Sequence, residues 1–381
     1  MTATIHKMLK EDDVKIFKPD PAEPSWLTDL RGEAFAEFGE RGFPSIKDED
    51  WKYTNVRPLI GGMTFEPVGN VPRSNDLSKN DRQMLERFAF DRNGFAAQNL
   101  ALGTIESFTI EGEQSGPLVL VPSNEECPNT IIHRLITVRP GTTATLIETY
   151  SSRSASFVNT AIQIVLEDNA QLTHYRIQRE SAETFQYGMT DVLLGRDSTY
   201  NSTNINFGGV LTRHDINVKF TAEGGEAYVD GLYMLDGNQH HDTHSVIDHS
   251  VPNCISHQTY KGVLNGRSRG VFNGKVFVRE DAHGTDARQS NKNLLLSNEA
   301  RVDTKPQLEI FNDDVKCSHG ATVGQLEDEE LFYLLTRGLP ATLARNLLTY
   351  GFAEEIINKI TAGTIKEELD AVVLNRLDAA I

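Results

Sequence analysis

The feature that most constrains the fold is a long series of short strand-like segments between Pro117 and Phe311. Apolar or alternating runs such as IIHRLITV, FVNTAIQIVL and GVFNGKVFV recur, separated by Gly-, Asn- and Asp-rich clusters such as RPGTT, AEGGE and LDGN. Runs in which apolar and polar residues alternate, bounded by turn-forming residues, are typical of β-strands. A β-sandwich is usually complete within about 100 residues. The length of this series therefore predicts a pair of barrels or a solenoid.

Within these two alternatives, the repetition has no sharp sequence period, so no known repeat family is indicated by spacing alone. Several Asn residues inside or beside the strand-like runs are typical of the corners of a solenoid: Asn204, Asn206, Asn265 and Asn273. We therefore favour a β-helix, in which each turn contacts only its neighbours.

Helical patterns flank the strand series on both sides. Near the N-terminus, Trp26–Phe38 has apolar residues at helical spacing and Asn75–Phe88 opens with capping residues. Between them, Trp51 and Tyr53 are candidate aromatic anchors of a loop or short helix. We expect three regions: a mainly helical region over 1–100, a β core over 101–320, and a small helical domain over 321–381.

The C-terminal helical pattern is strongly apolar for so short a region. Leu326–Leu339 has an acidic first turn, an apolar stripe and a stop signal at Gly338. The segments ATLARNLLTYGF, AEEIINKI and IKEELDAVVLNRLDAAI follow it and predict three or four short amphipathic helices in total. Their apolar stripes must pack either on one another or in a groove of a partner protein.

Composition excludes several classes of function. The net charge of −17 makes a broad nucleic-acid-binding face unexpected. The three cysteines Cys127, Cys254 and Cys317 are far apart, which argues against a disulfide framework and a self-contained zinc site. Neither an apolar leader nor an apolar run of membrane-spanning length occurs, so we expect a cytoplasmic protein without a membrane partner.

Sequence motifs give no support for an enzyme. The chain has no P-loop, no GxGxxG after a strand and no HExxH. We therefore expect a protein that is not a catalyst by any of these routes.

The richest polar cluster lies between Asn238 and Gly262. On an extended strand, His240, Asp242 and His244 would share one face, because side chains alternate from face to face. Imidazole and carboxylate groups on one strand face can bind a metal ion, as in cupin-type sites. Further donors follow at His249, Cys254 and His257. A β-helical or cupin-like metalloprotein is therefore one hypothesis, and a hydrogen-bonded polar ladder is the alternative.

A second candidate site is DDVKCSHGATVGQL, where Cys317 and His319 would share a strand face. The two residues could ligate metal, or form a catalytic couple if Lys316 or His319 lowered the pKa of the thiol. Alternatively, Cys317 is a small buried hydrophobe and His319 a strand-end histidine. Spacing alone leaves these alternatives open.

Several longer stretches resemble the SufB/SufD family of the SUF iron–sulfur cluster assembly machinery. They are DEDWKYTNVRPL, Tyr260–Val278, Asp286–Ser297, Asp303–Gly338 and Ala344–Ile357. Chains of the SufB branch carry an EHEA-type segment where this chain has CSHGATVG, and a cysteine near Asn291–Asn293. Both are absent here, so the resemblance is to the SufD branch.

The resemblance implies a right-handed parallel β-helix core with an N-terminal helical region and a C-terminal helical domain. It also implies a non-catalytic scaffold that pairs with SufB through the β-helix ends and binds the ATPase SufC through its C-terminal helices. Because open solenoid ends expose strand edges that normally need a cap or a partner, we also expect a homodimer when the chain is alone. His319 matches a histidine that helps to hold a transient iron–sulfur cluster shared with SufB, and Cys317 matches the neighbouring cysteine. By this resemblance the isolated chain binds no cluster tightly, because one imidazole and one thiol cannot complete a site.

Overall fold

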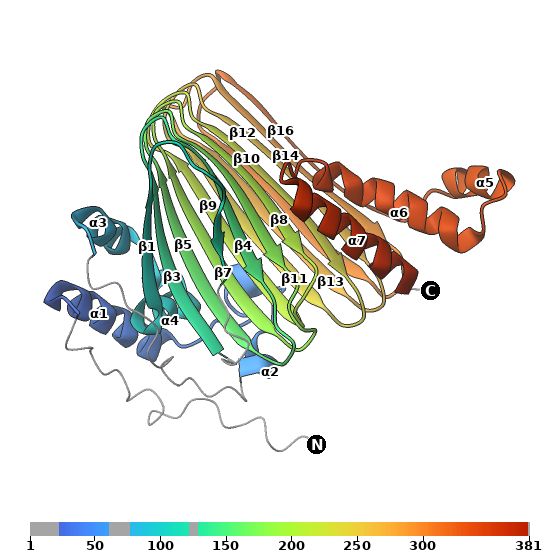
Figure 1. Cartoon of the computed structure of the whole chain (residues 1–381), viewed down its shortest axis with the longest axis horizontal. Helices are drawn as coiled ribbons and strands as arrows, with labels where there is room; N and C mark the ends of the chain where they lie inside the picture. Colours follow the sequence, from blue (N-terminus) through green and yellow to red (C-terminus); the bar gives the residue numbers. More distant parts are fainter. Residues whose placement is uncertain (1–22, 61–76, 122–128, 380–381) are drawn as a thin grey trace, which may run out of the picture.

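The computed structural model, which describes residues 23–60, 77–121 and 129–379, is a β-solenoid flanked by helices (Figure 1). Successive strands alternate between two facing parallel sheets of eight strands each. The order is β1-β3-β5-β7-β9-β11-β13-β15 in one sheet and β16-β14-β12-β10-β8-β6-β4-β2 in the other. Each turn contributes one strand to each sheet. The β-helix prediction is thus confirmed, and the alternative of two barrels is wrong.

The odd-numbered strands form the first sheet and the even-numbered strands the second. The first comprises β1 (Thr104–Ile110), β3 (Asn129–Val138), β5 (Phe157–Leu166), β7 (Phe185–Leu194), β9 (Leu211–Phe220), β11 (His240–His249), β13 (Arg269–Val278) and β15 (Arg301–Ile310). The second comprises β2 (Leu118–Leu120), β4 (Thr143–Tyr150), β6 (Gln171–Gln178), β8 (Thr199–Asn206), β10 (Glu226–Leu235), β12 (Ile255–Leu264), β14 (Thr285–Leu295) and β16 (Val315–Gly324).

The structural period of the solenoid is not repeated as a sequence motif. His240 lies beside Leu211 on one side and Arg269 on the other, each 29 residues away along the chain. Large apolar side chains such as Tyr200, Phe220 and Phe272 fill the interior between the sheets. A solenoid requires compatible volumes in adjacent turns rather than identical residues, which explains why its period is hard to see in the sequence.

The N-terminal helices cover one end of the odd-numbered sheet. They are α1 (Ser25–Arg41), η1 (Glu49–Trp51), α2 (Arg57–Ile60), α3 (Lys79–Arg87), η2 (Phe90–Arg92) and α4 (Gly94–Leu102). Their apolar residues share a core with β3, β5, β7 and β9. Ser78 begins α3 with a capping box, as its sequence predicts, whereas residues 75 and 76 of the expected helix lie outside the described residues.

The C-terminal helices lie against the outer face of the even-numbered sheet (Figure 1). They are α5 (Asp328–Thr336), α6 (Ala341–Ile357) and α7 (Gly363–Ala379). Lys261 of β12 donates a hydrogen bond of 3.0 Å to the carbonyl oxygen of Phe352, which ties α6 to the sheet. By contrast, α5 has no buried residue and lies at the end of α6 that points away from the sheets. In the described part of the chain, no helix is long and apolar enough to cross a membrane.

Candidate functional site at the open end of the solenoid

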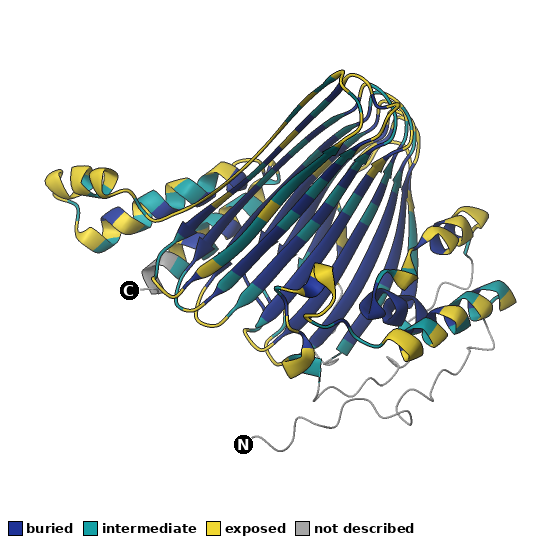
Figure 2. Ribbon diagram, turned by 180° about the vertical axis from the view of Figure 1, so that it is seen from behind, coloured by how far each residue is buried: buried dark blue, intermediate teal, exposed yellow. Residues whose placement is uncertain are grey.

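The last turn of the solenoid, formed by β15 and β16, is exposed. Strands of the inner turns are mostly buried, whereas most residues of β15 and β16 are exposed or intermediate (Figure 2). Phe311 and Val323 are 57% and 47% exposed, which is unusual for large apolar side chains at a strand end. Each of these two strands has a sheet neighbour on one side only, so the other edge presents unpaired backbone groups. We call this surface the open end.

Cys317 and His319 both lie on β16 at the open end. The register places Cys317 beside Ala287 and His319 beside Gln289 of β14. Cys317 is partly buried and packs against the interior core, and His319 is exposed. Because they are two residues apart on a strand, their side chains leave the strand on the same side, as the sequence predicts.

The environment of Cys317 does not favour a reactive thiolate. Burial raises the pKa of the Cys317 thiol, and the nearby Asp286 carboxylate raises it further. A nucleophilic cysteine needs a lowered pKa, which a neighbouring cation would supply. The raised pKa of Cys317 therefore gives no support for a catalytic couple of Cys317 and His319.

As metal donors, Cys317 and His319 form an incomplete set. Over residues 23–60, 77–121 and 129–379, no group of three or more His, Cys, Asp or Glu residues is arranged to hold a metal ion. Iron–sulfur clusters are commonly held by four donors. Any metal or cluster at the open end would consequently need donors besides these two residues.

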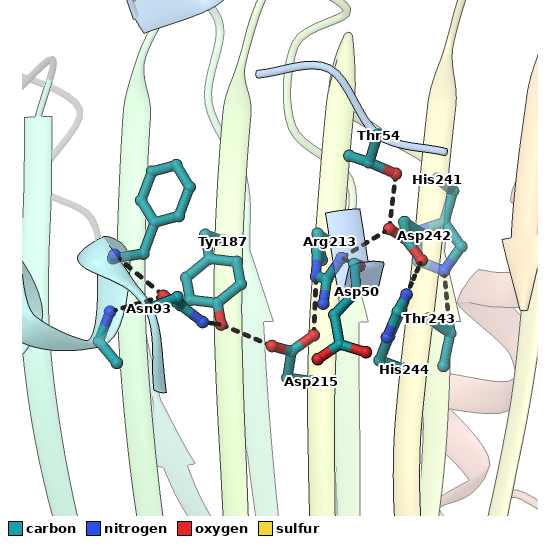
Figure 3. Close-up of polar contacts among 12 residues, drawn as sticks. Asp50, Thr54, Asn93, Tyr187, Arg213, Asp215, His241, Asp242, Thr243 and His244 are labelled. Carbon is teal, nitrogen blue, oxygen red and sulfur yellow. Dashed lines mark hydrogen bonds and ion pairs between the residues drawn. The ribbon is translucent and has the colours of Figure 1, made fainter. Parts of the chain in front are cut away.

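The other candidate site, around Asp242, is an ion-pair network instead of an open ligand set (Figure 3). The Asp242 carboxylate accepts a hydrogen bond of 2.6 Å from the Thr54 hydroxyl and lies 3.1 Å from both the Arg213 guanidinium and the His244 imidazole. Burial alone would raise the pKa of Asp242, but the charges of His244 and Arg213 outweigh it and lower the pKa well below its ordinary value.

The same network fastens the N-terminal region to the odd-numbered sheet. Arg213 lies 3.8 Å from the ring centroid of the buried Trp51 and also pairs with Asp215 at 2.8 Å. His240 lies 2.9 Å from the Thr54 hydroxyl, and burial lowers its pKa to about 4. The segment DEDWKYT therefore has a structural role here: it supplies the aromatic and hydroxyl groups that cover Asp242 and Arg213.

The remaining donors of this polar cluster do not converge on His240, Asp242 and His244. His249 faces the interior, where its Nε2 lies 2.8 Å from the Ser256 hydroxyl. Cys254 is part of the interior core, and His257 lies 3.5 Å from Asp286 on another strand. The histidines of β11 thus bond to hydroxyl and carboxylate groups on both faces of the strand.

A further exposed apolar surface lies on α5 and the first half of α6. It consists of Phe332, Tyr333, Leu335, Leu343 and Leu347. Singly exposed apolar residues are ordinary, but several on two adjacent short helices indicate a surface for a protein partner.

Comparison with known proteins agrees with the family predicted from the sequence. Residues 121–352 match the family described as SUF system FeS cluster assembly, SufBD core domain, and residues 13–63 match the SufBD protein N-terminal region. An iron–sulfur cluster assembly SufBD family protein of Synechocystis sp. is 38% identical, over 97% of this chain and 96% of the relative. The iron–sulfur cluster assembly protein SufD of Escherichia coli is 30% identical, over 88% and 90%. The SufD of Bacillus subtilis is 23% identical, over 98% and 99%. The chain belongs to the SufBD family of iron–sulfur cluster assembly proteins.

Proposed function

We propose that this protein is a non-catalytic scaffold subunit that lends His319, and with it the adjacent Cys317, to a nascent iron–sulfur cluster at a subunit interface. The observation that carries the proposal is the position of His319: an exposed imidazole on the edge strand of the open end. SufB, the paralogue implied by the family, would supply the remaining ligands. The protein would bind the cluster only until the cluster is transferred to an acceptor protein.

Pairing with SufB through the open end is supported by three features of β16. The strand has a free edge, its neighbourhood exposes large apolar side chains, and Gly320 follows His319. A side chain at Gly320 would meet no described atom within 4 Å, so the space beside it is open to the backbone of a second subunit. Without SufB, the same apolar surface would favour a homodimer of this chain.

Imidazole at the shared site suits a scaffold better than a full set of thiolates. Thiolates are the usual ligands of iron–sulfur clusters, and a histidine can replace one of them. A neutral nitrogen donor is a weaker ligand for iron than a thiolate, so the cluster can be passed on. A role for Cys317 as a ligand would require the loss of a proton that burial makes less favourable.

The ATPase SufC would bind the apolar surface of α5 and α6. The chain itself has no P-loop, so nucleotide hydrolysis would belong to the partner. Cys254 and Cys317 are free thiols, which supports a reducing compartment such as the cytoplasm.

The proposal is tested by purifying this chain with SufB and SufC and reconstituting the complex anaerobically with iron and sulfide. His319→Ala should leave the complex assembled and lower the transfer of clusters to an apo acceptor protein. His283→Ala is the control, because His283 is also exposed but lies in the turn before β14, beside the residues that precede β16 and not beside His319. Unimpaired transfer by His319→Ala would remove His319 from the ligand role.

A further inference from the structure

A row of side chains inside the solenoid leads to His319. The register pairs Gln258 of β12 with Gln289 of β14, and Gln289 with His319 of β16. The three residues therefore occupy equivalent positions in three successive turns. Because side chains in register along a parallel sheet stack on one another, Gln289 is the neighbour of His319 on the interior side.

Hydrogen bonds along this row define the direction of the Gln289 amide. Gln289 Nε2 donates to Gln258 Oε1 at 2.7 Å, and the Ser245 hydroxyl donates to the same oxygen at 3.1 Å. Because Gln289 Nε2 is bonded to Gln258 of β12, the Gln289 Oε1 is the amide atom left for His319, its other neighbour in the row. Gly274, on the facing sheet, leaves room for this arrangement, since a Cβ there would lie 2.2 Å from Gln289 Nε2.

The Gln289 oxygen lacks a donor among the described residues. Gln289 is only 3% exposed, and its Oε1 has no hydrogen-bond partner among the described residues. A buried carbonyl oxygen without a donor is destabilising. The residue next to it in the row, His319, carries a ring N–H that could satisfy it.

We propose that Gln289 is a positioning residue for His319: the exposed imidazole turns about its side-chain bonds until one ring nitrogen donates to Gln289 Oε1, a bond that the structure does not contain, and this bond fixes the tautomer. The other ring nitrogen then keeps its lone pair and faces away from the interior, toward the open end. Metal-binding histidines commonly have such an orienting partner on the second nitrogen. The benefit to cluster binding rests on the proposed function, whereas the hydrogen bond itself does not.

The test is NMR of the full chain, with ¹⁵N-labelled histidine and His319 assigned by its loss in His319→Asn. In the wild type we expect the ring nitrogens of His319 to report one neutral tautomer and its ring protons to show NOEs to the Gln289 side chain. Gln289→Leu should shift both ¹⁵N resonances to those of a tautomer mixture. Gln289→Glu, which keeps an acceptor, should retain one tautomer.

Gln186→Leu is the matched control, because Gln186 is equally buried, has no partner for its amide among the described residues, and lies on β7, far from β16. It should leave the His319 resonances unchanged. Identical His319 resonances in wild type and Gln289→Leu would overturn the proposal. If Gln289→Leu does not fold, missing NOEs between His319 and Gln289 in the wild type would overturn it.

The ligand role of His319 and its hydrogen bond with Gln289 can be refuted independently of each other. In the reconstituted complex, Gln289→Leu should weaken cluster binding roughly 10-fold, the lower end of the range for outer-shell partners of metal ligands. Normal cluster transfer by His319→Ala, together with the expected NMR result, would leave the hydrogen bond in place and refute only the ligand role.

Discussion

Cys317 and His319 are two residues apart on one strand, yet burial gives them different chemistry. Cys317 faces the core of the last turn, and burial raises the pKa of its thiol. His319 lies two residues further along the strand and is exposed, so its ring is accessible to a partner. Of the two side chains, only the imidazole is exposed.

Alkylation kinetics of Cys317 test this difference. Because only the thiolate reacts with iodoacetamide, a raised pKa predicts slower alkylation at pH 7 than that of a free cysteine, with the rate rising as the pH approaches the raised value. Mass spectrometry of the peptide containing Cys317 gives the rate, and the fully buried Cys254 is the internal control that should remain unmodified. Alkylation of Cys317 at pH 7 faster than a model thiol would contradict the raised pKa.

Buried histidines make the free energy of unfolding depend on pH. Burial lowers the pKa of His133 and His240 to about 4 and that of His241 to about 3. These groups stay neutral in the folded state while their unfolded counterparts bind protons below about pH 6.5. Their stabilising contribution to the free energy of unfolding is therefore complete above pH 6.5 and is lost as the pH falls toward 4.

The measurement is urea unfolding at pH 7 and pH 5. Each such histidine should lower the free energy of unfolding by at most about 2 kcal/mol at pH 5. In His241→Gln, whose side chain can still bond to Thr212 or Thr243, the loss between the two pH values should be smaller by about that amount. An equal loss in wild type and variant would show that His241 does not titrate as described.

At the scale of single elements, β11 is held to the N-terminal region by Asp242. Asp242→Ala would leave the buried Arg213 with Asp215 as its remaining acidic partner. Loss of one partner from a buried ion pair costs 3–5 kcal/mol in other proteins, and because Asp215 remains we expect about 3 kcal/mol here. Chemical denaturation measures it, with Asp286→Ala as a more exposed control that should cost less than about 1 kcal/mol. An equal cost for both variants would contradict the network.

We expect the exposed side chains of α5 to contribute to partner binding and not to the stability of the fold. Its Phe332 is 67% exposed, so Phe332→Glu should leave the unfolding transition unchanged within about 0.5 kcal/mol. The same variant should abolish copurification of SufC, because a charge in an apolar interface is left without a partner. Leu374→Glu on α7, where Leu374 is 48% exposed, is the matched control and should retain SufC. Retention of SufC by Phe332→Glu would place its site elsewhere.

Some elements could be predicted from the sequence and others could not. The strands of the solenoid and α5 follow from local alternation and helical spacing, which are set by near neighbours in the chain. The position of α6 and α7 on the even-numbered sheet could not be predicted, because their apolar partners, such as Ile205 and Val263, come from strands that lie about 100 residues or more before α7. The orientation of His241 and His249 into the interior follows from alternation once β11 is recognised as a strand.

The residues of the candidate site could likewise be predicted from the sequence only in part. Cys317 and His319 could be selected from the sequence, and their placement on one strand face follows from their spacing. Gln289 could not be selected, since it lies 30 residues earlier and contacts the site only through the register of β14 and β16. A search for buried amides one solenoid turn before a candidate ligand would have found it.

At the scale of the whole molecule, the N-terminal helices cover the outer face of the first strands of the odd-numbered sheet, whereas β15 and β16 leave an edge and an apolar surface exposed. An uncovered solenoid end normally needs a cap or a partner. The exposed apolar surface of α5 and α6 and the open end consist of different residues, so under the proposed function one subunit would bind both partners together.

The most direct test of the account measures nitrogen coordination of the cluster. The chain is labelled with ¹⁵N-histidine, assembled with unlabelled SufB and SufC, reconstituted anaerobically, reduced and examined by pulsed EPR. We predict a ¹⁵N coupling from this chain that persists in His283→Ala and disappears in His319→Ala. A reduced cluster without any ¹⁵N coupling, or one whose coupling survives His319→Ala, would contradict the claim that His319 is a ligand of the shared cluster.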